Sequence, residues 1–98
     1  MIEQKDVIAF FDERAGGWDA GMVRSDEKIG RILDNAAVRE GSRVLDIACG
    51  TGVLIGDYLR RNVESVTAVD ISPEMIRIAR EKFPQENVRF VCGDAETA

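Results

Sequence analysis

The sequence predicts an α/β fold in which three parallel strands alternate with two helices. Short runs of apolar and β-branched residues recur at positions 43–48, 65–69 and 88–92, and each is bounded by glycine or polar residues. Segments with helical spacing connect these runs. Strand, helix, strand, helix, strand is the pattern of a βαβαβ unit, which forms a parallel sheet with right-handed crossovers. The nearly continuous apolar character of the runs is typical of strands that helices cover on both faces.

Two helices are expected before the first strand. Residues 6–14 combine apolar and charged side chains in a pattern typical of a short amphipathic helix. Ser25 is a favourable N-cap for the second helix, because carboxylates follow it in the first turn, where the helix dipole stabilises negative charge. Gly41 is expected to end that helix. We therefore predict a helical lead-in over residues 1–40, followed by the α/β unit over residues 41–98.

The helices between the strands are predicted from their spacing and their caps. Residues 51–61 place four apolar side chains on one face. The next helix has a strong start, with Ser72 as N-cap and Pro73 at the first helical position, and it is expected to stop near Phe83. The alternation of strands and helices makes residues 41–98 a Rossmann-like βαβαβ half.

The composition limits the possible functions. The chain has 98 residues, of which 45% are hydrophobic and 32% charged, with a net charge of −5 and no histidine. Without histidine there is no imidazole for acid–base catalysis or for metal ligation, and we expect no metal. An acidic chain without a basic cluster argues against nucleic acid as a partner, since such binding neutralises phosphates with lysine and arginine.

The two cysteines and the apolar runs indicate the cellular compartment. Cys49 and Cys92 lie far apart without a second pair, so a disulfide scaffold is not expected and the thiols are expected to be reduced. The first residues do not form a signal peptide, and no stretch approaches the ~20 apolar residues of a membrane span. We therefore expect a cytoplasmic chain without a membrane partner.

The turn after the first predicted strand is the most informative stretch. Small residues at positions 48, 50 and 52 allow a sharp strand-to-helix turn and a close approach of a ligand to the backbone. A dinucleotide site would need a third glycine further on, and an isoleucine or a valine stands there in either register. Asp46 would repel a pyrophosphate but suits a cationic ligand such as S-adenosylmethionine. Spacing and charge therefore argue against a nicotinamide-dependent oxidoreductase.

The pattern Asp46-x-Ala48-x-Gly50-x-Gly52 resembles the first motif of class I S-adenosylmethionine-dependent methyltransferases. That motif is usually an acidic residue followed by three alternating glycines, and Ala48 replaces the first of them. The chain is similar to the small-molecule type, in particular to the quinone-biosynthesis C-methyltransferases. The resemblance implies S-adenosylmethionine as cofactor, with contacts along the turn from Asp46 through Ala48, Cys49 and Gly50 to Gly52.

The ends of the second and third strands carry the other implied contacts. In the family reading, Asp70 holds the ribose hydroxyls and Ile71 packs on the adenine; a solvated strand-end aspartate is the alternative. Met75 is a candidate adenine contact or, as the simpler alternative, core filler. Asp94, with Ala95 after it, is implied at the exocyclic amine of the adenine, against the alternative of a plain Gly-Asp turn.

The remaining candidates concern the lead-in and catalysis. The segment with Phe11 and Trp18 resembles the lead-in of small-molecule methyltransferases, where it can cover the cofactor; buried packing is the favoured alternative. Cys49 is not expected to act as a nucleophile, because the sequence offers no activating base. We expect no catalytic residue within the chain, because in many enzymes of this family the protein mainly orients the reactants.

The resemblance also implies what lies outside the sequence. The family sheet has seven strands in the order 3-2-1-4-5-7-6, and this chain supplies the part with order 3-2-1. The elements that hold a small-molecule acceptor would follow Ala98, so a truncated chain is expected to be inactive alone. Its first strand becomes an exposed edge, and pairing of residues 44–48 across a two-fold axis predicts self-association. A non-enzymatic cofactor-binding or self-associating module is the alternative function.

Overall fold

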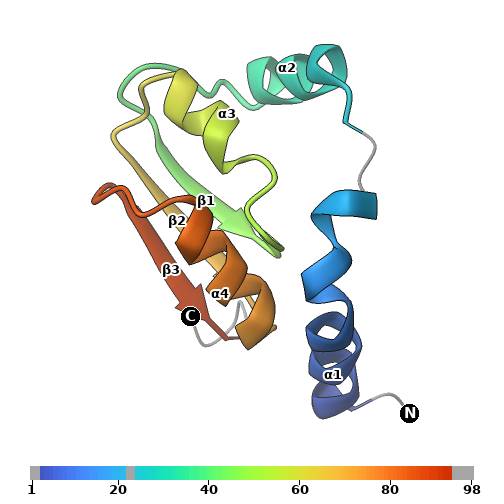
Figure 1. The fold of residues 1–98 in the computed structure, drawn as a ribbon. Helices are drawn as coiled ribbons and strands as arrows, with labels where there is room; N and C mark the ends of the chain where they lie inside the picture. Colours follow the sequence, from blue (N-terminus) through green and yellow to red (C-terminus); the bar gives the residue numbers. More distant parts are fainter. Residues whose placement is uncertain (1–2, 22–23, 94–98) are drawn as a thin grey trace.

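The computed structural model describes residues 3–21 and 24–93. A parallel three-stranded sheet follows an N-terminal segment of helices and short turns, and the strands end on the side where that segment lies (Figure 1). The elements are α1 (Gln4–Arg14), η1 (Ala15–Gly17), η2 (Asp19–Gly21), α2 (Asp26–Asn35), β1 (Arg43–Ile47), α3 (Ile55–Arg60), β2 (Ser65–Asp70), α4 (Pro73–Lys82) and β3 (Val88–Cys92).

The sheet confirms the predicted α/β class and strand order. β2 lies between β1 and β3, and the register pairs Val44 with Val66 and Val66 with Val88. These β-branched residues suit the pleated surface of a strand and pack into the core. β1 is an edge of the sheet that the described residues form.

Helices α3 and α4 pack on the same face of the sheet (Figure 1). Ile55 and Tyr58 of α3 and Ile76 of α4 share one core with the inward residues of the strands. On the other face Leu45 is 64% exposed and Ile47 is 46% exposed. The expectation that helices cover both faces is therefore wrong for the described residues. Two successive right-handed crossovers in one direction place both helices on one face, and only a reversal of strand order covers the other.

Two helix boundaries differ from the prediction. α3 begins at Ile55 rather than at position 51, because Gly50 and Gly52 adopt positive φ angles of 60° and 82° and keep the chain in turns. α2 ends at Asn35 rather than near Gly41, and Ala37 with a φ of 59° turns the chain out of the helix. The expected caps are confirmed for both long helices after the lead-in turns, since the serine side chains at positions 25 and 72 accept backbone N–H groups.

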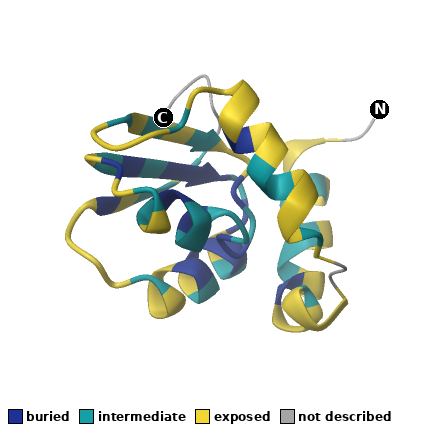
Figure 2. Ribbon diagram, turned by 90° about the horizontal axis from the view of Figure 1, so that it is seen from above, coloured by how far each residue is buried: buried dark blue, intermediate teal, exposed yellow. Residues whose placement is uncertain are grey.

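The N-terminal segment lies beside α4 and the ends of the strands (Figure 1). Seen from above, buried residues gather on the central strand and the helices against it, while much of this segment is exposed (Figure 2). Ala15 is its one fully buried residue among those described. The model contains no helix with the length and apolar content that crossing a membrane requires, as far as the described residues go.

Candidate functional site

A cavity of about 410 Å³ opens at the carboxyl ends of β1 and β2. This is the end of a parallel sheet at which α/β proteins bind ligands. Five of the residues predicted from the motifs line it: Ala48, Gly50, Asp70, Ile71 and Met75. The other lining residues are Phe11, Trp18, Ile47, Val69 and Gly93.

Residues 48–52, which we call the glycine turn, bring the backbone to the cavity. Gly50 has a φ of 60°, and a Cβ added to it would lie 3.6 Å from Nε1 of Trp18. Ala48 adopts the same left-handed conformation, with a φ of 61°, at the place of the family's first glycine. That conformation costs an L-residue roughly 1–2 kcal/mol. The replacement of glycine by alanine is therefore sterically possible but strained.

Asp70 is the only charged residue among the described residues that line the cavity. It is 8% exposed, and each of its oxygens accepts one backbone N–H group. The N–H of Gly50 donates to Oδ2 at 2.8 Å and the N–H of Ser72 donates to Oδ1 at 2.9 Å. A carboxylate has about four acceptor sites, so each oxygen can accept a further hydrogen bond from a ligand.

Asp46 does not line the cavity. It faces the helix layer, where the hydroxyl of Tyr58 donates to its Oδ2 at 3.1 Å. Burial, together with the negative charge of Asp70, raises the pKa of Asp46, and the hydrogen bond from Tyr58 only partly opposes this shift. Contact between Asp46 and a cofactor stays a prediction.

Cys49 and Gly52 also lie away from the cavity. The backbone N–H of Cys49 donates to the carbonyl of Val69 at 3.0 Å, and its thiol is buried. Burial, with the nearby carboxylates, raises the pKa of this thiol to about 12, so it is protonated at neutral pH and is a poor nucleophile. A Cβ on Gly52 would meet Cδ1 of Ile55 at 2.8 Å and the Phe83 ring at 3.3 Å. The cofactor contacts predicted for Cys49 and Gly52 remain untested.

Two predicted residues, Asp94 and Ala95, lie outside the described residues. The two aromatic candidates of the lead-in, by contrast, are well placed. The rings of Phe11 and Trp18 meet edge to face with their centroids 5.8 Å apart, and both side chains line the cavity. The two rings form one wall of the cavity and also pack against each other. The two roles considered for them, covering a cofactor and packing, are therefore compatible.

Two acidic residues that the motif analysis did not single out connect this aromatic wall to the rest of the molecule. Asp12 accepts a hydrogen bond from the Ser72 hydroxyl at 2.5 Å. Asp19 accepts hydrogen bonds from the hydroxyl of Thr51 and from Nζ of Lys82. Burial acts to raise the pKa of Asp19, but the bonds from Lys82 and Thr51 outweigh it and lower the pKa. Each acid directly follows an aromatic wall residue in the sequence, which is the signal that could have found them.

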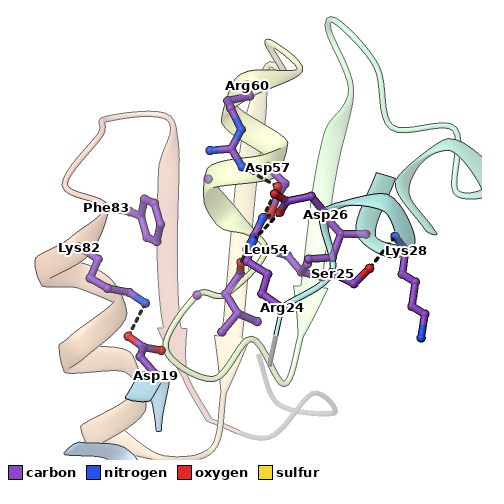
Figure 3. Close-up of a pocket in the computed structure, with 14 residues that line it drawn as sticks. Asp19, Arg24, Ser25, Asp26, Lys28, Leu54, Asp57, Arg60, Lys82 and Phe83 are labelled. Atoms are coloured by element: carbon purple, nitrogen blue, oxygen red, sulfur yellow. Dashed lines mark hydrogen bonds and ion pairs between the residues drawn. The ribbon is translucent and has the colours of Figure 1, made fainter. Parts of the chain in front are cut away.

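A larger hollow, of about 1190 Å³, lies between the start of α2, the start of α3 and the end of α4 (Figure 3). Its charged groups are largely neutralised by each other. Arg24 donates to both oxygens of Asp57, Arg60 pairs with the same carboxylate, and Lys82 pairs with Asp19 (Figure 3). Of the predicted site residues that the structure describes, only Gly52 lines this hollow. Most of the described motif residues therefore line the smaller cavity rather than the larger hollow.

The described residues contain no group of three or more histidine, cysteine, aspartate or glutamate side chains that could hold a metal ion. The chemistry available at the cavity is therefore that of one carboxylate, exposed backbone and apolar walls. Such a site can orient an uncharged or cationic ligand with hydroxyl donors.

Comparison with known proteins agrees with this geometry. A family model described as a methyltransferase domain matches residues 44–98, which is more than half of the chain. The chain belongs to this methyltransferase family. The match begins in β1 and takes in β2, α4 and β3 with the cavity that they form. The resemblance to class I S-adenosylmethionine-dependent methyltransferases is confirmed.

Individual methyltransferases share its sequence and its fold. A malonyl-[acyl-carrier protein] O-methyltransferase of Acetivibrio thermocellus is 37% identical, with 100% of this chain and 36% of that protein covered. A demethylmenaquinone methyltransferase of Chlorobaculum tepidum is 45% identical over 58% of this chain and 24% of its own. A solved DhpI–SAM–HEP complex matches with a TM-score of 0.69 and 26% identity, covering 92% of this chain and 42% of that one.

The chain thus spans about a third of the length of the Acetivibrio methyltransferase. S-adenosylmethionine is the cofactor of the family, and the DhpI structure holds it.

Proposed function

We propose that this chain binds S-adenosylmethionine in the cavity between α1, the glycine turn and the end of β2. The observation that supports the proposal most directly is the placement of Asp70. It is a single buried carboxylate at the carboxyl end of β2, with an acceptor site left on each oxygen. The vicinal hydroxyls of a ribose are two hydrogen-bond donors at the spacing of such a carboxylate.

The charge of the cavity suits the cofactor. S-adenosylmethionine carries two positive groups against one carboxylate, and Asp70 is the only charge among the described lining residues. We assign Gly50 and Ala48 to the close approach of the backbone, and Ile71 and Met75 to the adenine. Dinucleotides fit less well, because a pyrophosphate would face a carboxylate rather than a cation.

The remaining predicted residues have weaker roles in this proposal. We assign Asp46 an electrostatic influence through its negative charge, because its carboxylate faces Tyr58. Cys49 and Gly52 shape the turn. Asp94 and Ala95 are proposed adenine contacts on the sequence motif alone. When bound, S-adenosylmethionine supplies the activated methyl group, and the residues of this chain bind it and orient it.

We further propose that the whole protein transfers this methyl group to a small-molecule acceptor in the cytoplasm. Two relatives are named as methyltransferases of malonyl-[acyl-carrier protein] and of demethylmenaquinone, which supports an acyl or quinone compound as acceptor. The chain by itself is expected to bind cofactor without turnover, since the described residues that line the cavity include no candidate acid, base or nucleophile besides the Asp70 assigned to the ribose.

Self-association is a second property that one observation favours. β1 is an edge strand, and Leu45 and Ile47 on it are 64% and 46% exposed. Such an edge offers unpaired backbone groups and apolar side chains to a second strand. Light scattering of the chain at tens of micromolar tests this, and a strictly monomeric species would rule it out.

The deciding experiment is calorimetric titration of the purified chain with S-adenosylhomocysteine, with NADH as the control ligand. We expect saturable binding of S-adenosylhomocysteine and no heat from NADH. Binding of NADH alone would support a nicotinamide-dependent oxidoreductase instead. No binding of either would leave the self-associating module as the better description of this chain.

A further inference from the structure

Residues distant in the sequence form one continuous chain of hydrogen bonds beside the cavity. The Ser72 hydroxyl donates to Oδ1 of Asp12 at 2.5 Å, and the Ser72 backbone N–H donates to Oδ1 of Asp70 at 2.9 Å. The Gly50 N–H then donates to Oδ2 of Asp70 at 2.8 Å. The chain therefore runs from α1, through the start of α4, to the glycine turn.

Asp12 is placed to hold the start of α4 in one position. Its Oδ1 accepts both the Ser72 hydroxyl and, at 3.2 Å, the backbone N–H of Glu74 in the first turn of the helix. The first backbone N–H groups of a helix have no partner within it, and the helix dipole favours a negative charge there. The Ser72 oxygen in turn accepts the N–H of Met75 at 3.2 Å and is completely buried. Asp12 thus holds the side chain of Ser72 and the backbone N–H of Glu74 at the start of α4.

The same aspartate sits at the base of the aromatic wall. Phe11 directly precedes Asp12 in α1, and Trp18 directly follows η1. Both rings line the cavity whose carboxylate Ser72 orients. The bonds of Asp12 to α4 therefore join the wall on one side of the cavity to the carboxylate on the other.

We infer that Asp12 is a positioning residue of the cofactor site, which orients the Asp70 carboxylate through Ser72 while it docks the aromatic wall over the cavity. This inference rests on the proposed function, because it concerns the affinity of the same cavity for S-adenosylmethionine. A purely structural role for Asp12 predicts a different outcome, in which its loss lowers stability and affects binding independently of Asp70.

Calorimetric titration with S-adenosylhomocysteine tests the inference on three single variants. Asp12→Ala removes both hydrogen bonds and is expected to weaken affinity roughly 5–20-fold. Asp12→Asn keeps an oxygen at Oδ1, the atom that accepts both bonds, and is expected to recover most of that loss. Glu13→Ala is the matched control, because Glu13 is the next residue of α1 and its exposed side chain contacts only Arg14. It is expected to bind like the unmodified chain.

A double-mutant cycle separates positioning from simple stabilisation. If Asp12 acts through Asp70, Asp12→Ala should weaken affinity by a clearly smaller factor in an Asp70→Asn background than in the unmodified chain, because only the loss through the aromatic wall remains. Denaturant unfolding of every variant, done in parallel, shows whether each is folded at the titration temperature.

Each result separates this inference from the proposed function. Additive losses in the cycle, or equal affinities of Asp12→Ala and the unmodified chain, would overturn the role of Asp12 and leave the cofactor site standing. Failure of Asp12→Asn to recover affinity while it remains folded would also overturn that role. No binding by the unmodified chain would overturn the proposed function and this inference together.

Discussion

The glycine turn divides the molecule into two regions that use similar residues differently. On the side of the helix layer, Asp46 faces Tyr58 and Gly52 lies against Phe83. On the side of the cavity, Asp70 accepts backbone N–H groups and Gly50 lies beneath Trp18. Both sides have one acid and one glycine of the motifs, but only the acid of the second side lines a cavity, together with its glycine.

The difference follows from where each strand ends. Asp46 is still inside β1, paired in register with Ala68, so α3 covers it. Asp70 is the last residue of β2, and the chain turns directly into the start of α4. Asp70 lies two register positions beyond Asp46, so Asp70 reaches the cavity while Asp46 faces Tyr58 of α3. In this motif the two inner residues, Ala48 and Gly50, line the cavity, and the two outer ones, Asp46 and Gly52, face the helix layer.

The largest expected effect comes from placing the same methyl group on the two glycines. Gly52→Ala should lower the free energy of unfolding by roughly 2–4 kcal/mol, from the left-handed backbone and from overpacking. Its Cβ would lie 2.8 Å from Cδ1 of Ile55, at a φ of 82°. Denaturant unfolding measures the loss.

Gly50→Ala is the matched substitution on the cavity side. Its Cβ would meet only Nε1 of Trp18, at an ordinary 3.6 Å, so the stability loss should stay near the ~1 kcal/mol of a left-handed alanine. Its affinity for S-adenosylhomocysteine should fall instead. Equal stability losses at the two glycines would break the division between a packing side and a binding side.

The next largest difference is expected between substitutions of Asp70 and Asp46, in ligand binding rather than in stability. Asp70→Ala is expected to weaken the binding of S-adenosylhomocysteine by roughly 1.5–3 kcal/mol, the range for hydrogen bonds to a charged group. Asp46→Asn should change it by less than about 1 kcal/mol, since it removes only a charge that acts without contact. Calorimetry on both variants tests the comparison. A loss at Asp46 as large as that at Asp70 would place Asp46 in direct contact with the ligand.

A smaller effect is expected from the strained alanine of the turn. Ala48→Gly should raise the free energy of unfolding by ~0.5–1 kcal/mol, because glycine adopts a positive φ without steric cost although it loses more backbone entropy. Ala37→Gly is the control, since Ala37 has nearly the same φ, 59° against 61°, and lies outside the cavity. A gain at Ala37 without one at Ala48 would show that the glycine turn is not strained.

The smallest expected effect is on the pH dependence of stability, to which Asp46 and Asp19 should contribute with opposite sign. Burial raises the pKa of Asp46 above its ordinary 3.8, so its contribution to stability is complete below pH 3.8 and is lost as the pH rises through the raised value. Asp46→Asn should therefore gain stability over the unmodified chain as the pH rises from 3.5 to 7.

Asp19 provides the opposite case. Its pKa is lowered, because the hydrogen bonds from Lys82 and Thr51 outweigh its burial, so its contribution is present above pH 3.8 and is lost as the pH falls further. Asp19→Asn should lose stability at neutral pH and approach the unmodified chain in acid. Denaturant unfolding curves of both variants across this pH range measure the two trends. Parallel trends would contradict the assignment of Asp46 to the side of the helix layer.

Much of the fold could be predicted because it depends on local signals. The strands at positions 43–47, 65–70 and 88–92 follow from apolar runs, and the cap at Ser72 follows from a serine before a proline. The start of α3 was predicted four residues early, because the left-handed conformations of the glycine turn depend on packing against Phe83 as well as on residue type. Local patterns therefore locate elements better than they locate their ends.

The sequence by itself determined the parallel α/β class, the family and five of the residues that line the cavity. These depend on residue type and spacing along the chain, which are local properties. Only the tertiary structure decided that Asp46 and Gly52 face the helix layer, that α3 and α4 lie on one face, and that Asp12 and Asp19 join the lead-in to the site. Those contacts link residues up to 63 positions apart, and their geometry is set by how the layers pack.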